Sequence, residues 1–264
     1  MRFEKWHGLG NDYLLIERAD LERPLTPATV GRLCDGRTGI GGDGVLEIVD
    51  VDGIRAEVVI WNPDGSVAEL SGNGTRIAAS WLARRAAADQ VVIAVGSRTV
   101  EAQVLVSGLV RQEMGSVEVG APETLDLGCE QIELTPVSVG NPHAVIRRDP
   151  DPELVRRLGP LVEHHTRFPG RTNVQLMRVE GDDELTAGVW ERGVGETRSS
   201  GTGACAAAAA SIANGWCRGL VTVRLPGGTL WVSVSGEGEA TLIGPAQEIC
   251  TGVVARELLD ELTA

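Results

Sequence analysis

Residues 71–79 read SGNGTRIAA, and residues 200–208 read SGTGACAAA. Each stretch is a Ser-Gly-x-Gly turn followed by small residues, a pattern typical of a closely packed helix. The serines Ser71 and Ser200 are 129 positions apart, about half of the 264-residue chain. A glycine turn at the start of a helix can bind an anion, because backbone N–H groups and the positive end of the helix dipole point toward it. The sequence therefore predicts two similar halves, each with an anion-binding turn.

Strand-like segments flank each of these two helical runs, which predicts an α+β (mixed α/β) fold rather than a repeated βαβ pattern. Glycine and proline at residues 120–122 suggest a boundary, giving domains 1–119 and 120–252. Residues 253–262 are expected to be helical, and the segment 253–264 to pack back on the first domain. The other expected helices are 27–33, 75–87, 152–158, 161–166 and 204–214.

Composition excludes several classes of protein. The net charge of −13, from 37 acidic and 24 basic residues, disfavours nucleic-acid binding. No apolar run reaches the length of about 18 residues needed to span a membrane. The five cysteines are odd in number, and no CxxC pair or metal-ligand spacing occurs, so we expect a reduced, cytoplasmic protein without a metal site. The pair His164-His165 fits a charged surface segment better than a metal site.

Four loops concentrate glycine, asparagine and charged side chains: 7–12 (HGLGND), 61–66 (WNPDGS), 140–143 (GNPH) and 191–197 (ERGVGET). Taken singly, Asn-Pro and Pro-Asp-Gly are ordinary turn signals. In combination, arginine suits a carboxylate, asparagine supplies both a donor and an acceptor, and glutamate can hold an ammonium group. The loops together predict a binding site for an amino acid.

Six motifs in order resemble those of the diaminopimelate epimerase family of cofactor-independent amino-acid racemases and epimerases. They are HGLGND, TGIGGDG, NPDGSVAELSGNGTRIAA, GNPH, RTNVQL and ERGVGETRSSGTGACAA, and they run from residue 7 to about residue 210. The resemblance implies two pseudo-symmetric domains, each a curled mixed sheet around a central helix, with the active site in the cleft between them. It also implies a small amino-acid substrate, a role in lysine and peptidoglycan-precursor synthesis, no cofactor and a homodimer.

The family mechanism is a proton swap at the α-carbon between two cysteines, which stand immediately before the Gly-x-Gly of each turn. In this chain those positions are Ser71 and Ser200, and His143 and Glu191 correspond to the polar pair that assists them. One position departs further, since Gly44 stands where the family commonly has a substrate-contacting glutamine. The resemblance implies these substrate-binding residues: Asn11, Asn62, Gly72, Asn73, Asn141, Asn173, Glu191, Arg192, Gly201 and Thr202.

The resemblance also implies a role for each group of residues. Asn62, Asn173 and Arg192 would hold the distal carboxylate, and Asn141 and Glu191 the distal ammonium. The two turns, at residues 72–73 and 201–202, would hold the reacting carboxylate through backbone N–H groups. A serine before glycine is also a common helix N-cap, so the serines have a structural interpretation too.

The two serines change the expected chemistry. A thiol ionises near pH 8.5, whereas an alcohol ionises near the value for water, about 15.7, and a helix dipole contributes at most about 2 kcal/mol. Three interpretations stay open: an epimerase whose cysteines were replaced, a natural Ser/Ser relative that acts on diaminopimelate or another small substrate, and a binding protein without turnover. Asp43 is a weaker candidate acid, since a turn role explains it as well.

Overall fold

The computed structural model describes residues 1–263, which form two compact units. The first contains Met1–Gln112 and the C-terminal segment from Pro245, and the second contains Glu113–Gly244. Both units combine curled mixed sheet with a few helices, so the predicted α+β class is confirmed. The domain boundaries expected at residues 119 and 253 stay a prediction.

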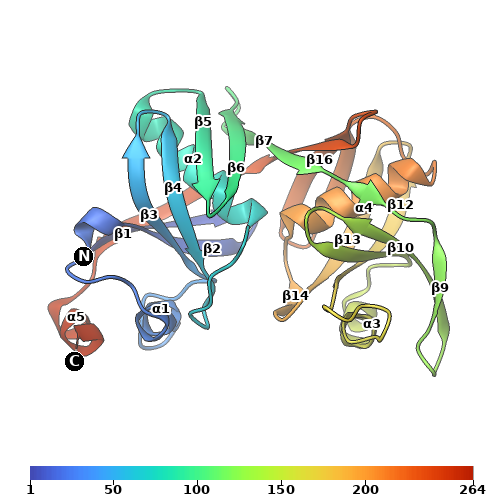
Figure 1. The fold of residues 1–264 in the computed structure, drawn as a ribbon, viewed down its shortest axis with the longest axis horizontal. Helices are drawn as coiled ribbons and strands as arrows, with labels where there is room; N and C mark the ends of the chain where they lie inside the picture. Colours follow the sequence, from blue (N-terminus) through green and yellow to red (C-terminus); the bar gives the residue numbers. More distant parts are fainter. Residues whose placement is uncertain (264) are drawn as a thin grey trace. The chain divides into compact units, whose positions relative to one another are not determined.

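In the first unit, neighbouring strands from β1 to β7 pair in the order antiparallel, parallel, antiparallel, parallel, antiparallel, antiparallel. Strand β18 adds to β1 at the edge (Figure 1). The strands are β1 (Arg2–Gly8), β2 (Asn11–Glu17), β3 (Val45–Asp52), β4 (Arg55–Trp61), β5 (Gln90–Val95), β6 (Arg98–Val104), β7 (Leu109–Ser116) and β18 (Gln247–Val253).

The second unit repeats this succession from β10 onward through β11, β12, β13, β15, β16 and β17. The two halves therefore share one topology, as the repeated turn motif predicts. The strands are β8 (Glu118–Val119), β9 (Glu123–Asp126), β10 (Gln131–Ser138), β11 (Pro142–Arg147), β12 (Asn173–Gly181), β13 (Glu184–Glu191), β14 (Gly195–Thr197), β15 (Val221–Leu225), β16 (Gly228–Val234) and β17 (Glu239–Pro245).

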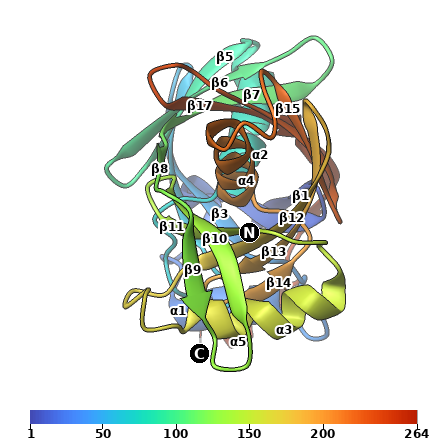
Figure 2. The ribbon, with the colours of Figure 1, turned by 90° about the vertical axis from the view of Figure 1, so that its right-hand side faces the viewer.

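Each unit has one long central helix, α2 (Gly72–Ala86) in the first and α4 (Gly201–Ala213) in the second. Residues 72–83 of α2 are all buried, and α4 contacts β10, β11, β12, β13, β15 and β16 (Figure 2). Alanine-rich helices suit this position because strands approach them closely on several sides. Both helices begin three residues earlier than the sequence predicts, because Ser71 and Ser200 cap them and the glycines form the first turn.

The remaining helices are the 3₁₀ turn η1 (Arg18–Asp20), α1 (Pro27–Cys34), α3 (Pro152–Glu163) and α5 (Arg256–Thr263). The sequence predicts two helices where α3 is continuous, and this prediction is wrong. Pro160 removes one backbone donor close to the end of the helix, while Val155, Leu158 and Val162 form a continuous buried face across it. The expected start of α5 at Val253 is also wrong, because β18 extends to Val253 and pairs it with Arg2.

Within residues 1–263, the structure contains no helix that combines the length and the apolar character needed to cross a membrane.

Candidate functional site

The residues singled out in the sequence fall into two groups, one on each unit. Asn11, Asn62, Ser71, Gly72 and Asn73 belong to the first unit. The second unit holds Asn141, His143, Asn173, Glu191, Arg192, Ser200, Gly201 and Thr202.

Ser71 lies at the N-cap of α2, between a backbone donor and a phenol. Its Oγ accepts a hydrogen bond from the Gly74 N–H at 3.0 Å and lies 3.1 Å from the hydroxyl of Tyr13. Tyr13 is buried on β2, and sequence reasoning missed it. Two signals were present, since Tyr13 directly follows the HGLGND motif and is the single tyrosine in the chain.

A buried arginine organises the turn that follows Ser71. Arg76 is fully buried and donates to the Gly72 carbonyl at 2.9 Å and to Asn73 Oδ1. Asn73 Nδ2 then donates to Asn11 Oδ1 at 3.1 Å, and Asn11 Nδ2 donates to Asp43 Oδ2 at 3.0 Å. The structure therefore brings Asn11 and Asn73 together, and Asp43 orients Asn11 through the hydrogen bond it accepts.

Asn62 is held differently from the other residues in the first group. Its Nδ2 donates to Ser66 Oγ at 2.9 Å, and its backbone N–H donates to the Ser66 carbonyl at 2.8 Å. These bonds stay within the 62–66 turn and do not connect Asn62 to Ser71.

Gly44 has no room for a side chain. A Cβ atom at this position would lie 2.3 Å from the Trp61 carbonyl oxygen and 2.7 Å from Cε1 of Tyr13. The Tyr13 ring thus occupies the space that a larger residue at position 44 would need.

Ser200 caps α4 and lies beside a carboxylate. Its Oγ accepts from the Gly203 N–H at 3.2 Å and is 3.5 Å from Glu191 Oε2, the outer limit of a hydrogen bond. The Thr197 hydroxyl donates to the other carboxylate oxygen, Oε1, at 2.7 Å. Thr197 therefore holds Glu191 in place next to Ser200.

His143 is completely enclosed between two amides. Its Nε2 lies 3.0 Å from Asn141 Oδ1, and its Nδ1 lies 3.1 Å from Gln175 Oε1. Burial lowers the pKa of His143 to about 4, against the opposing effect of the Gln175 hydrogen bond and with the help of the Arg192 charge. The ring is thus neutral at pH 7 and carries a single N–H, which donates to one of the two amide oxygens.

Gln175 was missed by sequence reasoning, although it belongs to the RTNVQL motif. It is two residues after Asn173 on β12, so both side chains point to the same face of the sheet. The amide Nε2 of Gln175 is buried without a hydrogen-bond partner among residues 1–263, and it would lie 3.0 Å from a Cβ at Gly203. Gln175 therefore contacts His143 through Oε1 and lies close to Gly203 in the first turn of α4.

Asn173 and Arg192 are joined through the backbone. The Arg192 N–H donates to Asn173 Oδ1 at 3.0 Å, and Asn173 Nδ2 donates to the Pro142 carbonyl at 2.9 Å. Within the described chain the Arg192 guanidinium donates to the Gly170 carbonyl at 3.2 Å. Because a guanidinium carries five N–H donors, it retains the capacity to bind a carboxylate.

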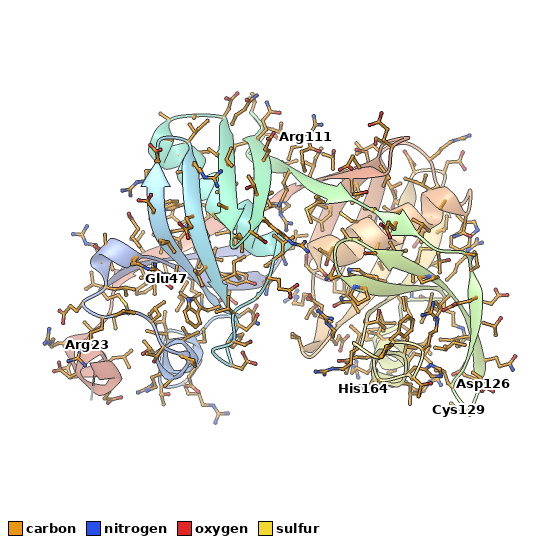
Figure 3. All side chains as sticks on the ribbon, in the orientation of Figure 1. Arg23, Glu47, Arg111, Asp126, Cys129 and His164 are labelled. Atoms are coloured by element: carbon orange, nitrogen blue, oxygen red, sulfur yellow. The ribbon has the colours of Figure 1, made fainter. Side chains whose placement is uncertain are left out.

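Among residues 1–263, no group of three or more histidine, cysteine, aspartate or glutamate side chains could hold a metal ion. His164 lies at the end of α3 (Figure 3), where its Nδ1 is 3.1 Å from the Pro160 carbonyl oxygen. His165 Nε2 is 3.1 Å from the Asp126 carbonyl oxygen. The two adjacent histidines thus contact different backbone groups.

We expect His143 to make the protein less stable in acid. An unfolded histidine binds its proton near pH 6.5, whereas folded His143 does so near pH 4, so the unfolded state holds more protons between these values. The stabilisation is complete above about pH 6.5 and is lost as the pH falls toward 4, by roughly 3 kcal/mol. Urea unfolding from pH 8 to pH 4 should show this loss in the native chain and a smaller one in His143→Gln. If the free energy of unfolding depends on pH in the same way in both proteins, the lowered pKa assigned to His143 is contradicted.

Comparison with known proteins identifies a family. The family model for diaminopimelate epimerase matches residues 3–120 and 135–249. The chain is 36% identical to the diaminopimelate epimerase of Desulforudis audaxviator, over 96% of this chain and 98% of the relative. It is 35% identical to that of Pseudomonas syringae pv. syringae, over 96% and 99%. A solved structure of a predicted epimerase from Pseudomonas aeruginosa has the same fold, with a TM-score of 0.70, 16% identity and coverage of 96% and 98%.

Proposed function

Because the chain belongs to the diaminopimelate epimerase family and is an isomerase, we propose that it interconverts the L,L and meso forms of diaminopimelate by inverting one α-carbon. One observation carries the proposal. Each unit has a Ser-Gly-x-Gly turn at the N-terminus of its central helix, with the serine Oγ held by the N–H of the second glycine and next to another ionisable side chain.

The second unit supplies groups that fit the distal end of diaminopimelate. We assign the guanidinium of Arg192 to the distal carboxylate, together with Asn173, to which its backbone is tied at 3.0 Å. Asn62 of the first unit is the third member of this set. Asn141 and Glu191 carry acceptor oxygens suited to the distal ammonium.

The reacting carboxylate is assigned to the two helix N-termini, at Gly72 and Asn73 in α2 and at Gly201 and Thr202 in α4. The first N–H groups of a helix have no acceptor inside the helix, and the helix dipole favours negative charge at that end. Asn11 contributes from the first position of β2 through its hydrogen bond with Asn73. This arrangement would stabilise the negative charge that develops when the α-proton leaves.

Ser71 and Ser200 are the two acid–base positions of the proposed swap. Glu191, 3.5 Å from Ser200, can accept the hydroxyl proton as Ser200 removes the α-proton. Neutral His143 lies behind Asn141 and fixes its orientation through their 3.0 Å contact. No cofactor is assigned a role in this proton transfer.

Two other functions remain candidates because an alcohol is a much weaker base than a thiol. One is isomerisation of a different small amino acid or anion by the Ser/Ser pair. The other is binding by the same residues without turnover. Each assigns the same binding residues and differs only in the substrate or in the chemical step.

The partner proposed for this chain, besides a small amino acid, is a second copy of itself in a cytoplasmic homodimer, as the family resemblance implies. Sedimentation of the purified protein would distinguish a mass near 56 kDa from the 27.9 kDa of a single chain.

The proposed reaction is tested by incubating the protein with L,L-diaminopimelate in deuterated water and following the α-hydrogens by NMR. Exchange accompanied by formation of the meso isomer supports epimerisation. Binding without exchange supports the interpretation as a binding protein. Absence of binding by calorimetry would contradict the substrate assignment, and exchange with another amino acid would support the alternative substrate.

A further inference from the structure

Tyr13 and His143 occupy matching places in the two units. Residues 10–13 read GNDY and residues 140–143 read GNPH, and both stretches begin with a glycine of positive φ, 84° and 76° respectively. Each stretch leads into a strand that begins a parallel pair, β2 with β3 and β11 with β12. Tyr13 is 130 positions before His143, nearly the spacing of the two turn serines.

The two positions make different contacts. His143 contacts Asn141 and Gln175, whereas the Tyr13 hydroxyl lies 3.1 Å from Ser71 Oγ. Ser200 lies instead beside the Glu191 carboxylate. One turn serine therefore has a phenol as its neighbour and the other has a carboxylate, so the two acid–base positions are chemically unequal.

We propose that Tyr13 is a positioning and proton-relay residue for Ser71. The inference rests on the proposed function and adds a residue to it. The Ser71 oxygen has two lone pairs, and the Gly74 N–H occupies one of them. When Tyr13 donates to the other lone pair, the hydroxyl hydrogen of Ser71 is the one left to point at a ligand.

The proton balance of the step is simple. The Ser71 O–H bond breaks as its proton forms the new Cα–H bond of the carbanion, and the Tyr13 proton moves to Ser71 Oγ. The negative charge of the carbanion then resides on the Tyr13 oxygen as a phenolate. In the reverse direction the phenolate takes the Ser71 proton while Ser71 Oγ takes the α-proton.

A phenol is a suitable partner for an alcohol in this step. In water phenols ionise near a pKa of about 10 and alcohols near the value for water, about 15.7. Leaving the charge on a phenolate is therefore favoured over leaving it on an alkoxide by about 5 × 10⁵-fold. Tyr13 is 6% exposed, so few water molecules compete for its hydroxyl.

Gly44 makes this placement of the ring possible. An alanine methyl at position 44 would lie 2.7 Å from Cε1 of Tyr13 and 2.3 Å from the Trp61 carbonyl. The backbone carbonyl cannot yield as a flexible side chain would. We therefore expect Gly44→Ala to displace the Tyr13 ring and to weaken its contact with Ser71.

The kinetic test uses Tyr13→Phe, which removes only the hydroxyl. We expect kcat to fall by about 10²-fold, a typical contribution of general acid–base catalysis, with KM within about twofold of the native value. In a Ser71→Cys background the same substitution should change kcat by less than about threefold, because a thiol at a helix N-terminus ionises without help.

Three results would overturn the relay. They are an unchanged kcat in Tyr13→Phe, an equal loss in the serine and Ser71→Cys backgrounds, and no exchange by the native chain at all. In the last case, exchange by the variant carrying both Ser71→Cys and Ser200→Cys would keep the proposed function while removing the relay. Failure of the relay and failure of the function are thus distinguishable.

A second test detects the hydrogen bond between Tyr13 and Ser71 by NMR, without measuring activity. Because Tyr13 is the single tyrosine, protein labelled with ¹³C at the tyrosine Cζ gives one phenol NMR signal. Removing the Ser71 hydroxyl in Ser71→Ala should shift this signal, whereas the matched change Ser200→Ala should leave it in place. An unmoved signal in Ser71→Ala, or equal shifts in both variants, would contradict the contact.

Discussion

Replacing both turn serines, by Ser71→Cys together with Ser200→Cys, is expected to raise the rate of α-hydrogen exchange from diaminopimelate by about 10²–10⁴-fold. Both positions are helix N-caps, where the backbone N–H groups and the helix dipole favour a thiolate over a thiol. An alcohol at the same place stays protonated, because its ionisation lies several pKa units further from neutrality. NMR in deuterated water measures the rate for the native and variant chains.

The matched control for this experiment is Ser199→Cys. Ser199 is buried and immediately precedes Ser200, but Ser200 is the residue that caps α4. A thiol at position 199 should leave the exchange rate at its native value. Loss of the serine caps should lower the free energy of unfolding of the double variant by about 1 kcal/mol for each helix. An equal gain in exchange rate in the Ser199→Cys control, or no gain in the double variant, would contradict the role assigned to the two capping positions.

Substituting Arg76 by methionine is expected to lower the free energy of unfolding by about 2–4 kcal/mol, because the buried hydrogen bonds from the guanidinium to its acceptors would be lost. Those acceptors are the Gly72 carbonyl and Asn73 Oδ1, and the arginine side chain is fully buried. The same change releases Asn73, and with it Asn11, from their present orientation. Urea unfolding measures the stability, and calorimetry with diaminopimelate measures the accompanying loss of affinity.

Arg84→Met is the comparison variant, since Arg84 lies on the same helix and its side chain is 58% exposed. Arg84 forms an ion pair with Glu248 at 2.9 Å and lies over the Trp6 ring. We therefore expect Arg84→Met to lower the free energy of unfolding by about 1 kcal/mol and to leave the affinity for diaminopimelate unchanged. Equal losses of stability and of affinity in Arg76→Met and Arg84→Met would show that the buried Arg76 does not organise the turn.

Local patterns predicted the two central helices and the serines that cap them. Serine, glycine and alanine at residues 71–79 and 200–208 are sufficient to place the caps and the central helices, because capping and helix propensity act within one or two turns. The prediction of two separate helices, 152–158 and 161–166, was wrong because contacts with distant residues decide the structure of this segment. The buried face formed by Val155, Leu158 and Val162 stabilises α3 across the proline, and that packing comes from the sheet.

Contacts between distant residues could not be predicted in this way. Tyr13 and Ser71 are 58 positions apart, and His143 and Gln175 are 32 positions apart. No local preference selects these pairs, because they meet only when β2, β11 and β12 pair in the observed register beside the helix N-termini. The same holds for Gly44, whose importance comes from the ring packed against it.

By itself, the sequence determined the family, the α+β class and the two-fold repeat, and it supplied the two serines that we propose as the acid–base positions. Only the tertiary structure decided what surrounds each serine: a phenol beside Ser71 and a carboxylate beside Ser200. The physical reason is the separation along the chain of the residues that interact. Caps and turns depend on neighbours along the chain, whereas the protonation behaviour of a buried group depends on side chains that the fold brings from elsewhere.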